Sequence, residues 1–118
     1  MENIENREQL LESYCAGKRN FSKIEFDDGQ NLSDIDLKGA SFEHCFLSDT
    51  DFSRANLEGC SFFECNIKCS DFTEANLTNA SIKNCSVEAT GFKNATISGF
   101  IFQNNYAYGI VINDIEFT

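Results

Sequence analysis

The sequence predicts an all-β solenoid of about four to five coils with four sides each, preceded by a short capping helix. Two observations carry this prediction. From Leu32 to Phe117 every fifth residue is apolar, with Ala107 the one small member, and residues twenty positions apart resemble one another. Helices repeat near 3.6 residues and strands near 2, so a strict period of five indicates a repeat architecture instead of either ordinary element.

A spacing of twenty sorts the repeat into four columns of side chains. Two positions before each apolar centre, small residues recur in four series. These series are Thr50, Ser70 and Thr90; Ala55, Ala75 and Ala95; Cys45, Cys65 and Cys85; and Ala40, Cys60 and Ala80. Four pentads therefore make one coil, and coils are expected to stack about 4.8 Å apart with paired backbones. The large centre and the small residue before it both point into the core.

The remaining positions of each pentad predict the turns. Short polar residues stand directly before most centres, where their side chains can accept hydrogen bonds from nearby backbone. Gly39, Gly59, Asn79 and Gly99 form a further series twenty apart, two positions after the centre. We expect a positive φ on that side of the coil, because glycine and asparagine tolerate it.

Residues 1–20 depart from the repeat and are predicted to cap it, whereas residues 21–118 form the solenoid of a single domain. Asn6 followed three residues later by Gln9 resembles a capping box, and Gly17 suits a helix C-terminus. We expect a helix over residues 6–16. Its apolar stripe, which would cover the first coil, is Leu10, Leu11, Tyr14 and Cys15.

The period also begins before Leu32, with one irregularity. Phe21 and Phe26 are five apart, but Leu32 is six residues beyond Phe26. Residues 27–31, which include aspartate and glycine, must therefore absorb one extra residue in a turn or bulge.

The composition limits the classes of function. The formal net charge is −10, from 19 acidic and 9 basic side chains. This balance argues against direct binding to nucleic acid or to an anionic membrane. The acidic N-terminus does not resemble a signal peptide, and no apolar run approaches the ~20 residues of a membrane span. We expect a cytoplasmic protein whose cysteines stay reduced.

The cysteines and the single histidine indicate neither catalysis nor a metal or cofactor site. Cys45, Cys65 and Cys85 are expected to stack in the core as small apolar residues, which does not make a tetrahedral site. Cys69 should point outward and is the candidate reactive thiol. His44 stands at an outward corner with no acid or nucleophile singled out beside it. The sequence predicts no catalytic, cofactor-binding or metal-binding residue, and hence no enzyme.

Several pentads resemble the A(D/N)LXX unit of the pentapeptide repeat family. Examples are Ala55-Asn56-Leu57-Glu58-Gly59 and Ala75-Asn76-Leu77-Thr78-Asn79, and the pattern covers about residues 30–118. The N-terminal segment up to Phe21 is similar to the start of several cyanobacterial members. The resemblance implies a right-handed quadrilateral β-helix, with the handedness taken from the family. Its best-understood members are dimeric, acidic DNA mimics that bind DNA gyrase, and this chain lacks their projecting loop.

Apolar residues at outward positions define the candidate interaction surface. Phe46 precedes a centre and Phe63 follows one, on adjoining sides of successive coils, where they would form one exposed patch. Near the C-terminus, apolar residues occupy places that are small or polar elsewhere, and they would leave an open coil end prone to aggregate. The predicted surface is Phe46, Phe63, Tyr106, Tyr108, Ile112 and Phe117.

Two arrangements would cover the predicted open end. One is a homodimer through the C-terminal coil about a two-fold axis, and the other is Tyr106 and Tyr108 folded across the end. The functional prediction is a non-enzymatic scaffold that binds an unknown protein partner, without contact to nucleic acid or membrane. The alternatives are an acidic DNA-mimic inhibitor of DNA gyrase or another nucleic-acid enzyme, and an immunity or antitoxin-like protein.

Overall fold

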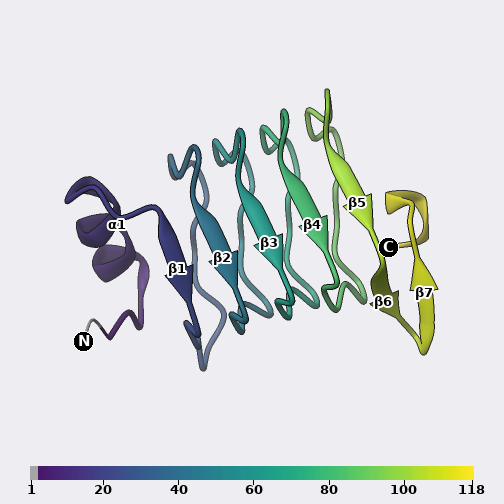
Figure 1. The fold of residues 1–118 in the computed structure, drawn as a ribbon, viewed down its shortest axis with the longest axis horizontal. Helices are drawn as coiled ribbons and strands as arrows, with labels where there is room; N and C mark the ends of the chain where they lie inside the picture. The colour runs from purple at the N-terminus through teal and green to yellow at the C-terminus, as the bar shows by residue number, and fades with distance from the viewer. Residues whose placement is uncertain (1–2) are drawn as a thin grey trace.

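The computed structural model describes residues 3–118, which form the predicted right-handed quadrilateral β-helix of about four coils behind one N-terminal helix. Five parallel strands stack along one side of the solenoid, with the helix at one end and a hairpin at the other (Figure 1). The elements in chain order are α1 (Arg7–Cys15), β1 (Asn20–Ser22), β2 (Ser41–Glu43), β3 (Ser61–Phe63), β4 (Ser81–Lys83), β5 (Ile101–Gln103), β6 (Asn105–Ala107), β7 (Ile110–Ile112) and the 3-10 helix η1 (Ile115–Phe117).

Coil length sets the register of the stack. Strands β2 to β5 pair with partners twenty residues apart. The first coil is one residue longer, because Phe21 of β1 stands opposite Phe42 of β2. On the third side the spacing of twenty is restored, because Asn31 pairs with Asp51. The extra residue is therefore absorbed between Phe26 and Gln30, as the sequence predicted.

Each pentad from Leu32 to Phe102 turns the chain with one residue in the left-handed region. Two positions after each centre, φ lies between 53° and 76° on all four sides. The positive φ expected for the glycine column is confirmed, and the other three sides share it. On three sides an amide–carbonyl bond also closes the turn, as from Ala55 N to Phe52 O at 3.0 Å. The φ value and this bond are those of a type II turn.

Stacked rings fill the core. The first stack is Phe21, Phe42 and Phe62, with centroids 5.4 and 5.1 Å apart, and the second is Phe52, Phe72 and Phe92, at 4.8 and 5.2 Å. Across the axis, Phe62 stands edge-on to Phe52 and Phe72, at 5.8 and 5.9 Å. Each such aromatic pair contributes about 0.5–1.5 kcal/mol beyond the burial of its area.

Polar side chains before the centres close the turns, as predicted. The Asp51 carboxylate accepts the Ser53 amide at 2.8 Å. Asn56 also links coils, because it donates to Asp36 at 3.2 Å and accepts from Asn76 at 3.3 Å. On three sides an aspartate or asparagine therefore orders its own turn, and in the column of Asp36, Asn56 and Asn76 these side chains also align neighbouring coils.

The helix α1 begins and ends one residue inside the predicted range. Asn6 is its N-cap and accepts the Gln9 amide at 3.0 Å. Leu10 is buried, whereas Cys15, which the sequence placed on the apolar stripe, is exposed. The prediction for Cys15 was wrong because the helix ends there and turns away from the coil.

Side-chain hydrogen bonds fasten α1 to the first coil. The Arg7 guanidinium donates to the carbonyls of Asn31 and Ser33 at 3.0 and 2.9 Å. The Tyr14 hydroxyl donates to the Lys38 carbonyl at 2.8 Å. These donors satisfy backbone oxygens at an end where no further coil exists.

The C-terminal end departs from the period. The sequence placed Ile112 in one column with Phe92, but β7 instead turns back and pairs antiparallel with β6, with Ile112 opposite Asn105. The two-residue loop has φ of 53° at Tyr108 and 78° at Gly109, as in a type I′ hairpin. The parallel repeat therefore ends at β6, and the prediction that it continues through Ile112 was wrong.

Asn105 replaces cysteine in its column and terminates it. Its side chain is fully buried. Its amide oxygen accepts the Cys85 amide at 2.9 Å, and its amide nitrogen donates to the Ile82 carbonyl at 3.0 Å. In the preceding coil the Cys85 sulfur takes the place of the amide oxygen, because it accepts the Cys65 amide at 3.4 Å.

Replacing Asn105 tests its role as the terminator of the column. Asn105→Ala should lower the free energy of unfolding by about 2–4 kcal/mol, because two buried hydrogen bonds lose a partner. Asn105→Cys should cost less than half as much, because sulfur can make the same two contacts. Urea unfolding monitored by circular dichroism measures both losses. Equal losses for the two variants would contradict this account.

Candidate interaction surface

The described residues 3–118 contain no cluster typical of a metal centre. No three His, Cys, Asp or Glu side chains in that range are placed to hold an ion. His44 Nδ1 lies 3.1 Å from Glu64 Oε2 at an outward corner, and both side chains are about half exposed. Such exposed pairs contribute little to stability. Within the same range, no helix is long and apolar enough to cross a bilayer.

Most of the stacked cysteines have raised pKa values. Cys45, Cys60, Cys65 and Cys85 are buried, whereas Cys15 and Cys69 are exposed. The Cys60 thiol donates to a carbonyl of the preceding coil at 2.9 Å, and burial raises its pKa to about 12. Hydrogen bonding of the Cys45 thiol with Cys65, together with burial, raises the pKa of Cys45. The hydrogen bond with Cys65 lowers the pKa of Cys85, but that thiol is buried as well. Because a thiol must be both ionised and accessible to react, burial keeps the core thiols unreactive.

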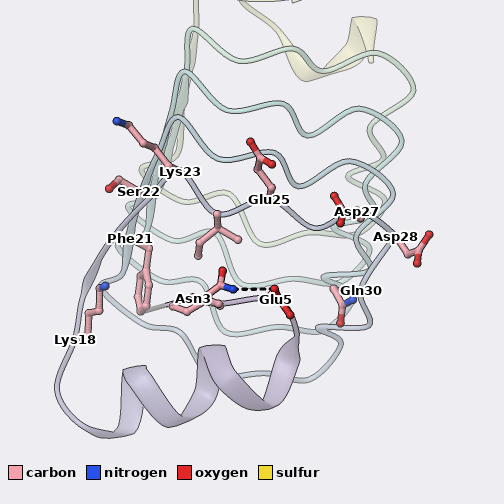
Figure 2. Close-up of a pocket in the computed structure, with 12 residues that line it drawn as sticks. Asn3, Glu5, Lys18, Phe21, Ser22, Lys23, Glu25, Asp27, Asp28 and Gln30 are labelled. Atoms are coloured by element: carbon pink, nitrogen blue, oxygen red, sulfur yellow. Dashed lines mark hydrogen bonds between the residues drawn. The ribbon is translucent and has the colours of Figure 1, made fainter. Parts of the chain in front are cut away.

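A hollow of about 440 Å³ lies beside the first coil, between β1 and the segment that leads into α1 (Figure 2). Its lining is polar and carries both signs of charge, with Lys18 among the bases and Glu25 among the acids. The Lys18 ammonium lies 5.4 Å from the centroid of the Phe21 ring. Figure 2 shows Lys23 and Asp28 directed outward. The hollow is the part of the first coil that α1 leaves uncovered.

The opposite end of the solenoid carries most of the exposed large apolar side chains. We call this set the C-terminal surface: Ile97, Ile101, Tyr106, Tyr108, Ile110 and Val111. Their exposed fractions run from 42% to 70%. A hollow of about 620 Å³ adjoins it, lined by Ile97, Phe100 and Ile101 on one side and by residues 113–115 on the other. An apolar face of this kind is typical of a contact with another molecule.

The C-terminal surface also lies on a part of the chain without carboxylates. Between Glu88 and Asp114 the only charged side chain is Lys93, although the whole chain carries a net charge of −10. Glu88 and Asp114 border this surface, because the Glu88 carboxylate accepts the Tyr108 amide at 3.0 Å and Asp114 lines the adjoining hollow. A molecule that contacts the apolar side chains between them avoids burying an acid, which would be costly.

Backbone amides at this end also lack partners. In the preceding coil, Phe72 N donates to Gly91 O and Leu77 N to Thr96 O, both at 2.8 Å. The amides that would follow one coil later are those of Phe92 and Ile97, and neither has an acceptor within residues 3–118. The hairpin thus covers only part of the last coil.

The structure distributes the predicted surface residues over several environments. Phe46 is 46% exposed and Phe63 is only half-buried, and no ring contact joins them within the described chain. Tyr106 and Tyr108 are exposed, so they do not fold across the end. Ile112 is buried at 5% exposure, and its assignment to the surface was wrong because β7 turns its side chain inward.

Two further positions complete the comparison with the sequence. The side chain of Phe117 lies outside the described residues. Ile97, which was missed, is 46% exposed because the coil that would cover this centre is replaced by the hairpin. The dipeptide Tyr108-Gly109 was the available signal for that hairpin.

Comparisons with known proteins agree with the fold. A family profile described as "Pentapeptide repeat region" matches residues 35–112. Two structures of QnrB1, a plasmid-mediated fluoroquinolone resistance protein, are 23% and 24% identical with a TM-score of 0.69. The matches cover 75% and 76% of this chain but 47% and 51% of QnrB1, so the chain spans about half the length of that protein.

A second solved structure matches over more of its length. Alr5209, a pentapeptide repeat protein from Nostoc Pcc 7120, is 27% identical with a TM-score of 0.54, over 91% of this chain and 84% of its own. No curated protein sequence matches the chain. The likeness to QnrB1, at under 25% identity, is a likeness of fold alone.

Thiol labelling tests the two classes of cysteine. A disulfide reagent at neutral pH should modify only Cys15 and Cys69 in the native protein, and all six thiols in denaturant. The buried thiols should stay unmodified because the reagent cannot reach them. Mass spectrometry of the labelled protein identifies the sites. If Cys45 or Cys60 in the native protein were modified as fast as Cys69, the description of a packed, inaccessible column would be wrong.

Proposed function

We propose that this chain, which belongs to the pentapeptide repeat family, is a rigid scaffold without catalytic activity that binds another protein through its C-terminal surface. The observation that carries the proposal is the concentration of exposed apolar side chains on the long segment between Glu88 and Asp114, which contains no carboxylate. Outside it, Phe46 is the only large apolar side chain of comparable exposure in the described residues. Scattered single apolar residues need no explanation, whereas a gathered set indicates a contact.

The core supports a role as a rigid scaffold. Stacked rings and in-register backbone bonds fix every coil relative to its neighbours. A surface presented on such a stack loses little conformational entropy on binding, which favours affinity. The proposal includes a cytoplasmic location, supported by four buried cysteines that are all free, since oxidising compartments favour disulfides.

The acidic sides support a second candidate, an acidic mimic of DNA that inhibits DNA gyrase or another nucleic-acid enzyme. Asp51 lies opposite Asp71 in register one coil away, so two carboxylates stand in a row on a rigid support. Such rows can compete with phosphates for a basic surface. An immunity or antitoxin-like role would use the same rows against a basic toxin.

Affinity capture with matched charge variants tests the scaffold. Ile110→Lys should reduce retention of specific partners by about tenfold or more, because a charge replaces an apolar contact. Phe46→Lys makes the same charge change at a similar exposed fraction outside the C-terminal surface, and should retain those partners. Quantitative mass spectrometry of the retained proteins compares the variants. Partners lost from Phe46→Lys but kept by Ile110→Lys would contradict the proposal.

A supercoiling assay tests the mimic. If the acidic rows act, the protein should inhibit DNA gyrase, and the inhibition should weaken with rising salt as the charges are screened. The double variant Asp51→Asn/Asp71→Asn should weaken it further. Asp114→Asn/Glu116→Asn removes the same charge away from the rows and is the control. No inhibition at high protein concentration would rule out gyrase as the target.

A further inference from the structure

The first coil leaves part of its backbone without partners at the end of the solenoid that carries α1. We propose that the outer edge of β1, together with the hollow beside it, binds an extended basic peptide segment of another protein. The segment would pair with the backbone of β1 and place lysine or arginine side chains against the carboxylates of the hollow. This site lies at the opposite end from the C-terminal surface and is separate from the proposed function.

The pairing of the second coil shows which backbone groups of the first coil point outward. The Glu43 carbonyl accepts the Lys23 amide at 3.1 Å. The Phe46 amide donates to the Ile24 carbonyl at 2.7 Å, and the Phe46 carbonyl accepts the Phe26 amide at 3.0 Å. In a parallel ladder the amide and the carbonyl of one residue point to the same neighbour, so Glu43 and Phe46 direct their backbone to the first coil.

The equivalent residues of the first coil have no such neighbour. Ser22 and Glu25 stand in register with Glu43 and Phe46, and Asn20 continues the row at the start of β1. Their amides and carbonyls therefore point away from the second coil, and none of these six groups has a hydrogen-bond partner in the described chain. β1 is the first strand of the five-stranded sheet (Figure 1). An open sheet edge of this kind can add a strand from another chain.

The unpaired groups face open volume. The helix α1 covers the two remaining sides of this coil, where Arg7 and Tyr14 donate to backbone carbonyls. Ser22 and Glu25 instead line the hollow of about 440 Å³ (Figure 2). A second hollow of about 370 Å³ adjoins β1 and β2. A strand can therefore reach the edge of β1 without displacing α1.

The charge of the hollow selects the occupant. Glu5, Glu25 and Asp27 contribute carboxylates to its lining. Of the lysines in the lining, Lys23 is directed outward, and the Lys18 ammonium lies over an aromatic ring. The carboxylates thus dominate the hollow, on a chain of net charge −10. A lysine or arginine of the added segment is attracted to them, and its hydrogen bonds to a carboxylate are stronger than those between neutral groups.

The same features disfavour other occupants. Two copies of this chain joined at β1 would bring the carboxylates of both hollows together, and like charges repel. An apolar segment would gain little, because Phe21 and Ile24, the core residues beneath the hollow, are already buried at 2% and 5% exposure. Backbone pairing and charge therefore provide the affinity. Because the contact is small, we expect binding in the micromolar range that weakens as salt screens the charges.

Calorimetric titration with a short peptide of alternating lysine and threonine measures the site. The full chain should bind this peptide, and added salt should weaken the binding. The same peptide with every backbone amide N-methylated keeps its charges but cannot pair with a strand, so it should bind at least about tenfold more weakly. Equal affinity for the two peptides would show attraction by charge alone and would overturn the proposal. Binding that salt leaves unchanged would contradict the role of the carboxylates.

Matched variants locate the binding. Glu25→Gln/Asp27→Asn removes two acids from the hollow and should weaken peptide binding by about tenfold. Glu58→Gln/Glu74→Gln removes the same charge from the sides of the solenoid and should bind like wild type. Ser22→Pro removes one outward amide while leaving the bonds of its neighbours to β2, and should also weaken binding, whereas Ser22→Thr keeps the amide and should not. Equal losses from the two double variants would contradict the location.

Amide hydrogen exchange supplies a test that does not depend on the folding of the proline variant. At saturating peptide, exchange of the Asn20, Ser22 and Glu25 amides should slow by at least about tenfold, because new hydrogen bonds protect them. The Phe92 and Ile97 amides, which lack acceptors at the other end, are the control and should exchange as in the free protein. No slowing on the first coil, or equal slowing at both ends, would overturn the proposal. Slowing without peptide that grows with protein concentration would show that a second copy occupies the edge, and would overturn the peptide as occupant.

Discussion

Each coil takes the partners of its backbone from the coil above and the coil below, and this dependence requires coils of equal length. The single longer coil shows what a departure costs. Ser70 and Thr90 donate their hydroxyls to carbonyls of the preceding coil at 2.8 Å. Thr50, above the irregular first coil, is buried with no such partner in the described structure. Gly29 is required there, because a β-carbon would collide with the Asp49 carbonyl.

The same dependence makes the two ends chemically different. At the N-terminus, side chains of α1 satisfy some carbonyls of the first coil. At the C-terminus only some of the missing backbone partners are replaced by side chains. The Asn104 amide donates to the side-chain oxygen of Asn113 at 2.7 Å, whereas the equivalent amide one coil below, that of Asn84, donates to the Gln103 carbonyl. The amide of Phe92 has no such substitute in the described part of the chain. The incomplete end is therefore where the fold leaves both polar and apolar groups available.

Most of the fold follows from the period, because stacking like residues on like fixes columns, turns and register. The hairpin does not, since Ile112 satisfies the five-residue period and the alternation of a strand equally well. The same ambiguity explains the errors in the predicted interaction surface. Ile97 has the sequence of a buried centre and is exposed only because no coil follows it, whereas Phe63 is half-buried beside Glu43 and Lys83 of the neighbouring strands. Exposure at the end of a repeat depends on where the repeat stops.

Where the repeat stops also determines which assemblies are available. A solenoid with two open ends could add copies head to tail without limit, because each contact would leave another open end. Here α1 covers part of one end through Arg7 and Tyr14, which opposes head-to-tail addition at that end. A contact between like ends closes after two copies. The acidic sides act in the same direction, since lateral contacts bring carboxylates together. The cap and the charge thus make a contact least costly at the end that the hairpin leaves partly uncovered.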